Sequence, residues 1–546
     1  MIKLGISAFY HDSAAAIIVN GKVLAAVEEE RFTGVKHDNS FPYKSINFCL
    51  NEAGIKINSI NEVHWYENPL KKDDRVKTIF NKRPFRTFFL RQRYNKDKKV
   101  NSPKNLLKSL GYSGKIIYHD HHYSHSAFSF FTSPFRNAAI LSVDGVGEWE
   151  TVSISYGNEN NIKKLYSDNF PHSLGMLYST ITSFLGFKPN EGEYKVMGLA
   201  PYGDASKYYD KLNVIFNQSK QELHIYQKYF TWEYSDKIMF TKKLCRLLEL
   251  PPRMPGETLT QDHKDLAASL QKIYEERFSL LLLKAKKLTG STNICLSGGC
   301  AYNGVANVLA YNFFDSVYIP FAPSDAGSAI GACLDKHVEI SPYLGPSFKN
   351  RWVKLLLDKN KSKLYSFRLK EDSLVKNVSE LIASQKIVAW YQGKMEFGAR
   401  ALGNRSILAS PKDPKMREKL NFIVKKREGF RPFAPSVPLE EASKFFDIKE
   451  PVPYMNIVVK TKVNYLPAAT HIDGTSRVQT VTEKSNPLYY KLLKEVGRLT
   501  GLPVVLNTSF NLKDQTITLT PAQAIQRFIN SDIDVLVINN FLIFKR

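Results

Sequence analysis

Short apolar runs separated by polar turns open the chain and return near residue 140. Ile2 to Ser7, Ala14 to Val19 and Val23 to Glu29 are apolar runs of strand length, and Asn20-Gly21 joins the last two. Asn-Gly between apolar runs is the strongest short-range signal for a β-hairpin. The same order of strand, hairpin and strand returns between Ala138 and Tyr156. The pattern predicts two related strand-and-hairpin units.

Strand, polar turn, strand, tight hairpin and strand is how the actin-like and sugar-kinase-like nucleotide-binding fold begins, and a duplicated fold of this kind shows the pattern twice. We therefore predict the α/β class, with a duplicated actin-like domain at residues 1–350. Residues 338–365 contain Pro342 and Pro346 without clear periodicity, which is typical of a domain boundary. Residues 366–546 mix short strands with helices and are predicted to form a second, α+β domain.

The first polar turn carries a candidate catalytic residue. His11 lies in the turn that faces a phosphate or acyl group in actin-like folds, and its unperturbed pKa near neutrality suits a general base. The alternative is a turn residue that bonds its own backbone. The loop at residues 33–43 is rich in hydrogen-bond donors, and it contributes Lys36 and His37 as candidate acceptor-binding residues.

Three histidines within five residues indicate a metal site. If residues 121–132 are helical, His121 and His125 lie one turn apart on the same face, where two imidazoles bind one ion. Asp144 ends an apolar strand, so its carboxylate is expected at the edge of the sheet where active sites of α/β folds lie. Asp325 is either a helix N-cap or a second carboxylate ligand. The alternative for the whole cluster is helix capping and surface polarity.

Glycine-rich and charged loops add candidate nucleotide and substrate contacts. A strand ending at Leu296 leads into paired glycines and a helix, an arrangement that lets phosphate approach the backbone. Charged residues among glycines at 190–200 suit a loop that lines a substrate, the alternative being a well-packed turn. The candidates for nucleotide binding are Gly145, Gly298, Gly299 and Asn303, and those for the acceptor loop include Glu193 and Lys195.

The second domain concentrates basic residues with Ser, Thr and Asn. Such groups bind phosphate and carboxylate oxygens, and arginine binds two oxygens at once. Gly, Pro and aromatic residues between the charges argue against a merely solvated basic face. The candidate anion-binding residues are Arg400, Arg405, Lys425, Arg431, Arg477, Asn507 and Ser509. Lys426 is adjacent to Lys425, and the pattern leaves open which of the two faces a pocket.

Composition restricts the classes of protein that remain. The 546 residues carry a net charge of +24, compatible with nucleic acid, an anionic surface or anionic substrates. The densest basic stretch, Lys71 to Lys99, is interleaved with Phe85 and Phe88, and residues 68–105 are predicted to form an irregular, flexible insertion. Five cysteines without a CxxC pair favour a reducing compartment. With neither a signal peptide nor an apolar run of membrane length, a soluble cytoplasmic protein is expected.

The chain resembles, nearly from end to end, the O-carbamoyltransferases of the nodulation-factor, cephamycin and tobramycin type. The matching stretches are His11-Asp12-Ser13-Ala14-Ala15, the His-His-x-x-His block at 121–125, Val143 to Trp149, Glu191 to Gly203, Leu296 to Gly299, Ser324 to Gly327, Arg400 to Arg405 and Arg431 to Pro435.

This resemblance implies two catalytic units. The first is similar to the threonylcarbamoyl-transferase of tRNA modification, and the second to the enzyme that makes threonylcarbamoyl-adenylate. Carbamoyl phosphate and ATP would give carbamoyl-adenylate in the second unit. The first would move the carbamoyl group to a hydroxyl of a small molecule, natural product or glycan. The resemblance suggests ferrous iron on His121, His125, Asp144 and Asp325. The ligand set alone also allows zinc or manganese, and magnesium is a further candidate.

Competing interpretations predict different features. A tRNA-modifying enzyme of the threonylcarbamoyl type shares the fold and would suit the basic surface, but such enzymes are not fused to a second unit with these arginine blocks. A sugar kinase predicts no inward histidine pair, and a scaffold does not explain polar residues at strand ends. The expected partners are carbamoyl phosphate, ATP and a hydroxyl-bearing acceptor, without membrane or nucleic acid. The acceptor, the native metal and the oligomeric state stay open.

Overall fold

Two five-stranded sheets within the first 318 residues repeat one topology. The computed structural model describes residues 1–546 except 83, 101, 218, 220–221 and 236–237. The first sheet has the order β3-β2-β1-β4-β5, and the second has the order β10-β9-β6-β7-β8. Their strands are β1 (Ile2–Ser7), β2 (Ala14–Val19), β3 (Lys22–Glu28), β4 (Glu62–Trp65), β5 (Lys115–Tyr118), β6 (Asn137–Val143), β7 (Glu150–Asn158), β8 (Asn161–Asn169), β9 (Asn293–Ser297) and β10 (Ser316–Tyr318).

The pairing directions identify the fold. In each sheet the first three strands are antiparallel, and the first strand then pairs in parallel with a later one, β1 with β4 and β6 with β9. This repeated order is that of the duplicated actin-like fold, so the predicted fold class is confirmed. The predicted hairpin is also present, because Asn20 and Gly21 both have positive φ, at 52° and 80°. Positive φ at both central residues is what a type I′ turn requires.

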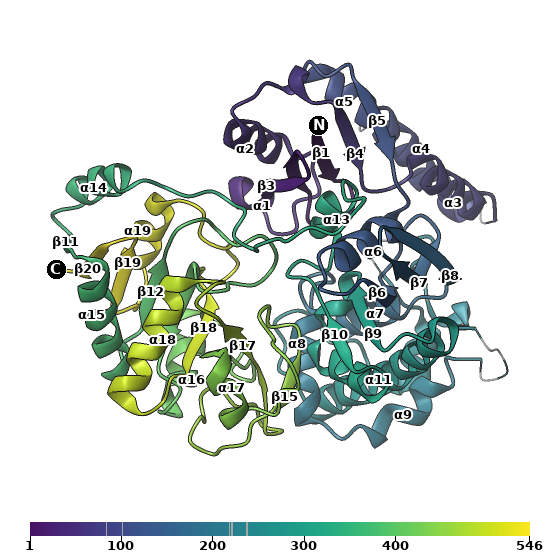
Figure 1. Cartoon of the computed structure of the whole chain (residues 1–546). Coiled ribbons are helices and arrows are strands. Elements are labelled where there is room, and N and C mark those ends of the chain that lie inside the picture. Colours follow the sequence, from purple (N-terminus) through teal and green to yellow (C-terminus); the bar gives the residue numbers. More distant parts are fainter. Residues whose placement is uncertain (83, 101, 218, 220–221, 236–237) are drawn as a thin grey trace. The chain divides into compact units, whose positions relative to one another are not determined.

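Two helices between these sheets position the histidines and aspartates. Helix α6 (His121–Phe131) packs on β6, β7 and β9, whereas α13 (Asp325–Gly331) packs on β1 and β2. The two helices also pack against each other (Figure 1). Glycines allow the close approach: a Cβ on Gly331 would lie 2.0 Å from the carbonyl oxygen of Ser124. The beginning of α13 is therefore held beside the face of α6.

The chain divides into two compact units. Unit 1 comprises residues 1–29 and 37–340, and unit 2 comprises residues 30–36 and 341–546. The remaining helices of unit 1 are α2 (Tyr43–Ala53), α3 (Pro69–Lys82), α4 (Pro84–Val100), α5 (Pro103–Ser109), α7 (Leu174–Phe184), α8 (Glu193–Leu199), α9 (Ser206–Asn213), α10 (Lys242–Leu248), α11 (Gln261–Thr289) and α12 (Gly304–Asn307). The expectation that residues 68–105 are irregular is wrong, because α3, α4 and α5 occupy most of them.

Unit 2 is built on an eight-stranded mixed sheet of order β11-β20-β19-β12-β13-β18-β14-β17. Trp390, Leu408 and Val537 from this sheet and Leu492 from α18 belong to one buried core. Its elements are α1 (Glu30–Thr33), α14 (Asn350–Lys359), β11 (Leu364–Arg368), α15 (Glu371–Ala383), β12 (Val388–Tyr391), β13 (Arg405–Ala409), α16 (Lys415–Glu418), β14 (Ala434–Pro438), α17 (Leu439–Phe445), β15 (Val458–Lys460), β16 (Thr475–Arg477), β17 (Gln479–Val481), α18 (Pro487–Thr500), β18 (Val505–Ser509), α19 (Pro521–Ile529), β19 (Val535–Ile538) and β20 (Phe541–Lys545).

Residues 30–36 belong to unit 2 although they follow β3 of unit 1, and no sequence pattern predicted this. Arg31 is buried and donates a hydrogen bond of 2.8 Å to the carbonyl oxygen of Gly398. Phe32 packs against Met395, Ile517 and Leu519. The crossing segment is thus part of the core of unit 2.

Candidate functional site

Four buried side chains from three elements converge in unit 1. His121 and His125 lie on α6, Asp144 follows β6, and Asp325 is the first residue of α13. The two histidine Nε2 atoms are 3.0 Å apart, and each lies 3.1 Å from Oδ2 of Asp144. Oδ1 of Asp325 lies 3.6 Å from Nε2 of His121 and 3.4 Å from that of His125. The structure therefore brings together the four residues that were predicted as metal ligands.

This cluster fits a divalent cation. Asp325 is 0% exposed, yet neither of its oxygens accepts a hydrogen bond of normal geometry from a described residue. A buried carboxylate without a donor is costly unless a cation compensates it. Ser324, not Asp325, occupies the N-cap position of α13, so the carboxylate of Asp325 faces the histidines. Two imidazole nitrogens and two carboxylate oxygens form a ligand set that suits zinc, iron or manganese.

The surroundings of the cluster orient its ligands. Oδ1 of Asp144 accepts backbone hydrogen bonds from Gly145 at 2.7 Å and Gly299 at 3.3 Å, which leaves Oδ2 facing the histidines. Nδ1 of His125 lies 3.0 Å from the hydroxyl of Ser328. Partners of this kind fix the rotation of ligating side chains.

The charges of the four groups depend on one another. Burial lowers the pKa of His121, but Asp325 and Asp144 outweigh it and raise that pKa to about 9. Burial raises the pKa of Asp144, but the two histidines hold it well below its usual range. A cation bound here would take over the role of the protons on the imidazoles.

The third histidine of the block has a separate role. His122 is 1% exposed, and its Nδ1 lies 2.9 Å from the hydroxyl of Ser153 on β7. Burial, together with His121 and His125, lowers the pKa of His122 well below its usual value, so the ring is neutral. His122 therefore packs α6 on the second sheet.

His11 is the first member of a chain of three polar side chains. Its Nδ1 lies 3.0 Å from Oδ2 of Asp12, and Oδ1 of Asp12 lies 2.6 Å from Nδ1 of His37. With Nδ1 facing a carboxylate, Nε2 of His11 is the nitrogen that can accept a proton from a substrate. Burial lowers the pKa of His11, but Asp325 and Asp12 raise it to about 10. His11 thus lies within the electrostatic field of the cluster.

The predicted nucleotide loop supports the same cluster. Gly298 has φ +85°, and a Cβ there would lie 2.2 Å from the carbonyl oxygen of Val143. The backbone N–H of Gly299 donates to Asp144, and Asn303 caps α12 through Ala306. The geometry therefore assigns these residues packing and orienting contacts in unit 1.

The predicted acceptor-loop residues lie in different surroundings. Glu193 accepts hydrogen bonds from the hydroxyl of Ser179 at 2.6 Å and the backbone of Asn190 at 3.0 Å. The ammonium of Lys195 lies 5.5 Å from the ring centre of Phe187. Lys36 belongs to unit 2, whereas His37 belongs to unit 1, so the loop at 33–43 contributes to both.

A second, cationic site is centred on Lys425 in unit 2. Lys425 is 5% exposed and donates to the backbone carbonyls of Ser509 and Asn511 and, at 2.8 Å, to Oδ1 of Asn511. Burial lowers its pKa well below the usual range, and nearby cations lower it further; they are Arg427, Arg431, Arg527 and Lys36. No carboxylate of a described residue pairs with Lys425. Lys426 is exposed, so Lys425 is the one that faces inward.

Arg477 and Arg400 extend the cationic character of unit 2. Burial lowers the pKa of Arg477 well below its usual range, and the positive charge of Arg400 lowers it further. Half-buried cations that repel one another are stabilised by a bound anion, since phosphate or carboxylate oxygens satisfy arginine and lysine donors.

Arg405 and Asn507 make contacts within unit 2, and their predicted contact with a ligand stays a prediction. Arg405 is 0% exposed, its Nη1 and Nη2 donate to backbone carbonyls that include Gln392 and Pro346, and its guanidinium lies over the ring of Tyr391. The side-chain amide of Asn507 donates to Gln479 at 2.9 Å. Both residues hold the sheet of unit 2 together. Ser509 donates to Asn511 and so supports a contact of Lys425.

Several residues around these sites were missed by sequence reasoning. Asp12 links two histidines, and its position beside His11 in the matched motif was a signal for it. Ser328 and Arg527 were missed because each lies far along the chain from its partner.

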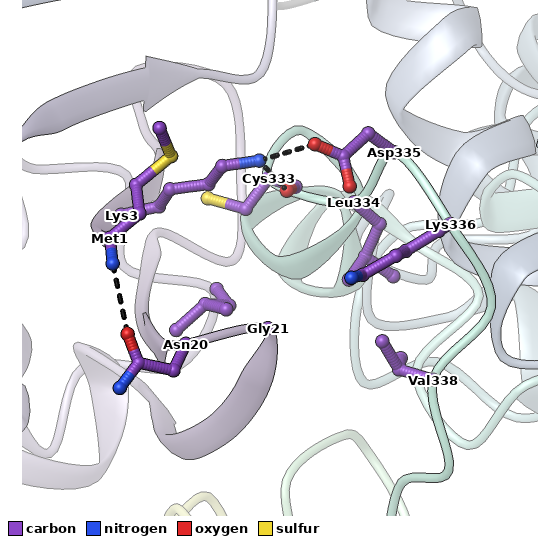
Figure 2. A pocket seen from close by; sticks show the side chains of 10 residues that line it. Met1, Lys3, Asn20, Gly21, Cys333, Leu334, Asp335, Lys336 and Val338 are labelled. Atoms are coloured by element: carbon purple, nitrogen blue, oxygen red, sulfur yellow. Dashed lines mark hydrogen bonds and ion pairs between the residues drawn. The ribbon is translucent and has the colours of Figure 1, made fainter.

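A separate cavity lies at the start of β1 in unit 1 (Figure 2). It has a volume of about 210 Å³. Lys3 reaches Asp335 at 2.7 Å along its wall, and the amino group of Met1 bonds Asn20 at 2.9 Å. It contains none of the predicted site residues.

The fold and the buried cluster define an actin-like protein with a candidate metal site, and the comparisons give its family. The carbamoyltransferase N-terminus family matches residues 2–334, and the carbamoyltransferase C-terminus family matches residues 379–545. The chain belongs to the carbamoyltransferase family, so its reaction is transfer of a carbamoyl group. Among the described residues, no helix has the length and apolarity that crossing a membrane requires.

Curated relatives match nearly the whole chain. Protein sll1178 of Synechocystis is 38% identical over 99% of this chain and 96% of its own length. Nodulation protein NolNO of Sinorhizobium fredii is 35% identical over 98% of this chain and 79% of its own length. Among solved structures, a ROK hexokinase from Thermus thermophilus covers 62% of this chain and 98% of its own, with 12% identity and a TM-score of 0.29.

Proposed function

We propose that this carbamoyltransferase is ATP-dependent and that its two half-reactions use different units. In unit 2, carbamoyl phosphate loses phosphate to one water, and the resulting carbamate oxygen attacks the α-phosphorus of ATP. This gives carbamoyl-adenylate and releases pyrophosphate. In unit 1, an acceptor hydroxyl attacks the carbamoyl carbon, forming the O-carbamoyl product and releasing AMP.

The observation that carries the proposal is the presence of two buried sites of opposite character in one carbamoyltransferase. The site around Lys425 is cationic and suits polyphosphate and carbamoyl phosphate. The site around Asp325 is rich in carboxylates and suits a cation. A single-step transfer from carbamoyl phosphate would leave one of the two sites without a role.

Residues of unit 1 supply what the transfer step needs. A bound cation would supply Lewis-acid polarisation of the carbamoyl carbonyl. Asp12 holds the ring of His11 with Nε2 free to accept the hydroxyl proton. Burial lowers the pKa of His11, whereas Asp325, Asp12 and Asp144 raise it. Neutralising the charge of Asp325 and Asp144 would lower this pKa and favour the neutral imidazole, which is the form that acts as a base. We keep iron, zinc and manganese as candidates, with magnesium accompanying ATP.

Separating the half-reactions tests the proposal. His11→Ala should keep carbamoyl-phosphate-dependent exchange of pyrophosphate into ATP, because that step uses no acceptor hydroxyl. Transfer to an alcohol should fall by roughly two to four orders of magnitude, the usual contribution of a positioned general base. Hydroxylamine, which attacks without base assistance, should still trap the carbamoyl group as hydroxyurea.

Lys425→Met should abolish the exchange. Lys412→Met is the matched control, because Lys412 is exposed and also donates to a backbone carbonyl, that of Thr500. A wild-type rate of pyrophosphate exchange in Lys425→Met would show that carbamoyl-adenylate does not form at this site of unit 2. Loss of exchange in a folded His11→Ala protein would show that His11 serves the first step.

A further inference from the structure

Helices α3 and α4 form a basic pair beside the transfer site. Residues 69–100 contain twelve Lys and Arg against three Asp. The helices pack side by side (Figure 1). Asp73 is paired with Lys77 at 2.7 Å and Lys98 at 2.9 Å. Lys82, Arg91 and Lys96 are exposed and form no ion pair with any described residue. Lys71, Lys72, Lys77 and Lys98 are ion-paired, so the unneutralised charge on the described surface is that of Lys82, Arg91 and Lys96.

The base of α3 is fixed to the elements that carry the cation cluster. Lys71 pairs at 2.7 Å with Asp120, the residue immediately before α6. Asp74 accepts a hydrogen bond of 3.1 Å from the indole of Trp149, in the segment that follows Asp144. A molecule bound along α3 therefore reaches the N-terminal end of α6, where His121 lies.

Arg75 continues this positive surface into the protein. Its Nε and Nη1 atoms are buried and have no hydrogen-bond partner among the described residues. Its guanidinium lies 5.3 Å from the ring centre of Phe170. Burial and the carboxylates of Asp144 and Asp325 raise the pKa of Tyr10, and the positive charge of Arg75 opposes this rise. The ring centre of Tyr10 lies 4.8 Å from that of His11, so Tyr10 lies between Arg75 and His11 in this series of interactions. A buried guanidinium with unused donors is a site for an anionic group.

We infer that the acceptor is an acidic glycan whose negative groups bind Arg75 and the exposed cations of α3 and α4 while one of its hydroxyls lies in the transfer site. This inference rests on the proposed transfer to a hydroxyl. Charge complementarity supports the occupant: the surface offers spaced cations that lead to a buried arginine, and an acidic saccharide offers spaced anions and many hydroxyls.

Two other polyanionic partners fit the surface less well. Binding of single-stranded RNA uses several aromatic platforms for base stacking. An interfacial membrane helix needs an apolar face. The apolar residues of α4 are instead distributed around the helix in the sequence. Among the described side chains of α3 and α4, Leu70 and Phe88 are the exposed large hydrophobic ones.

Direct binding by the whole 546-residue chain tests the inference without the carbamoyl reaction. The probe is a fluorescein-labelled oligogalacturonide of about ten sugars, compared with its neutral methyl ester by anisotropy over a salt series. The oligogalacturonide should bind, with the dissociation constant of the ester at least about tenfold higher.

The test variants remove charge from the surface. The triple change Lys82→Gln, Arg91→Gln and Lys96→Gln should weaken binding at least about tenfold and reduce the salt slope by about three, one for each charge. Arg75→Gln should weaken it as well, with partial recovery in Arg75→Lys. The matched control is the triple change Lys163→Gln, Lys207→Gln and Lys287→Gln at exposed lysines elsewhere in unit 1, which should bind like wild type.

Other outcomes would overturn the inference. Absence of oligogalacturonide binding, or equal binding by the test and control triples, would show that α3 and α4 do not bind an acidic glycan. Binding of single-stranded RNA of matched charge at least about tenfold tighter than the sugar would identify a nucleic-acid surface. Preferential binding to vesicles containing about 30% phosphatidylserine would identify a membrane surface. A failure of pyrophosphate exchange changes none of these readouts, so the two proposals fail separately.

Discussion

Replacing Asp325 by asparagine should remove the stabilisation of unit 1 by divalent cations while leaving the cation-free protein nearly unchanged. The amide keeps the shape of the carboxylate side chain but removes its charge. Without a bound cation the variant loses the attraction between Asp325 and the imidazoles of His121 and His11. It also avoids the cost of burying a carboxylate whose oxygens have no hydrogen-bond donor of normal geometry, and this offsets the loss. We expect the cation-free variant to lie within about 1 kcal/mol of wild type, because neutral replacement of buried charges is often tolerated.

The cation-bound protein should respond much more strongly. A ligand at one hundred times its dissociation constant stabilises the folded state by about 2.7 kcal/mol. Unit 1 has roughly 330 residues, so its unfolding entropy near the midpoint is about 0.7 kcal/mol/K and the wild-type Tm should rise by about 4 °C. If loss of one of four ligands weakens affinity about a hundredfold, the same cation concentration stabilises Asp325→Asn by only about 0.4 kcal/mol, a shift below about 1 °C.

Thermal unfolding of chelated and cation-loaded protein measures this difference. Iron(II) under anaerobic conditions, zinc and manganese are compared at equal free concentration. Asp210→Asn is the matched control, because Asp210 is exposed on α9 and the same chemical change there should preserve the response of about 4 °C. An equal cation-dependent shift in wild type and Asp325→Asn would refute the assignment of Asp325 as a ligand.

Three further changes test other parts of the structure. Lys425→Met should abolish the thermal stabilisation that inorganic phosphate or ATP gives to wild type; an unchanged response would place the anion elsewhere. Burial lowers the pKa of His263, whose Nδ1 accepts the backbone N–H of Thr260 in a capping box. The folded state therefore favours neutral His263, and stability is lost as pH falls below about 6.5; urea unfolding should show this dependence in wild type and not in His263→Gln. Gly298→Ala should destabilise unit 1 by at least about 2 kcal/mol in the same assay because its Cβ overlaps the carbonyl of Val143, and wild-type stability would contradict the backbone geometry.

The cluster in unit 1 was predictable because its strongest signals are local. His121 and His125 are related by one helical turn, and Asp144 ends a recognisable apolar strand. Asp325 needed the fold, since its two sequence interpretations, cap and ligand, differ only in where the carboxylate points. His122 shows the limit of counting histidines: it is one residue from a predicted ligand, but its Nδ1 lies beside the hydroxyl of Ser153 instead of the two aspartates.

Basic side chains in unit 2 were harder to assign from composition. Arg405 and Lys425 look alike in a basic, glycine-rich sequence. Only the structure shows that the guanidinium of Arg405 bonds backbone carbonyls and stacks on Tyr391, whereas Lys425 lies among other cations without a carboxylate. Burial and long-range pairing, which decide the difference, are not encoded in local spacing.

The placement of residues 30–36 in unit 2 has a consequence for how the chain reaches its native state during synthesis. Arg31 and Phe32 leave the ribosome early, but Gly398, Met395 and Ile517 follow several hundred residues later. At translation rates of about 5–20 residues per second, this segment waits on the order of half a minute for its partners. Unit 1 must therefore fold while residues 30–36, which interrupt it in the sequence, still lack their partners in unit 2. For the same reason, no single cut of the gene yields both units complete.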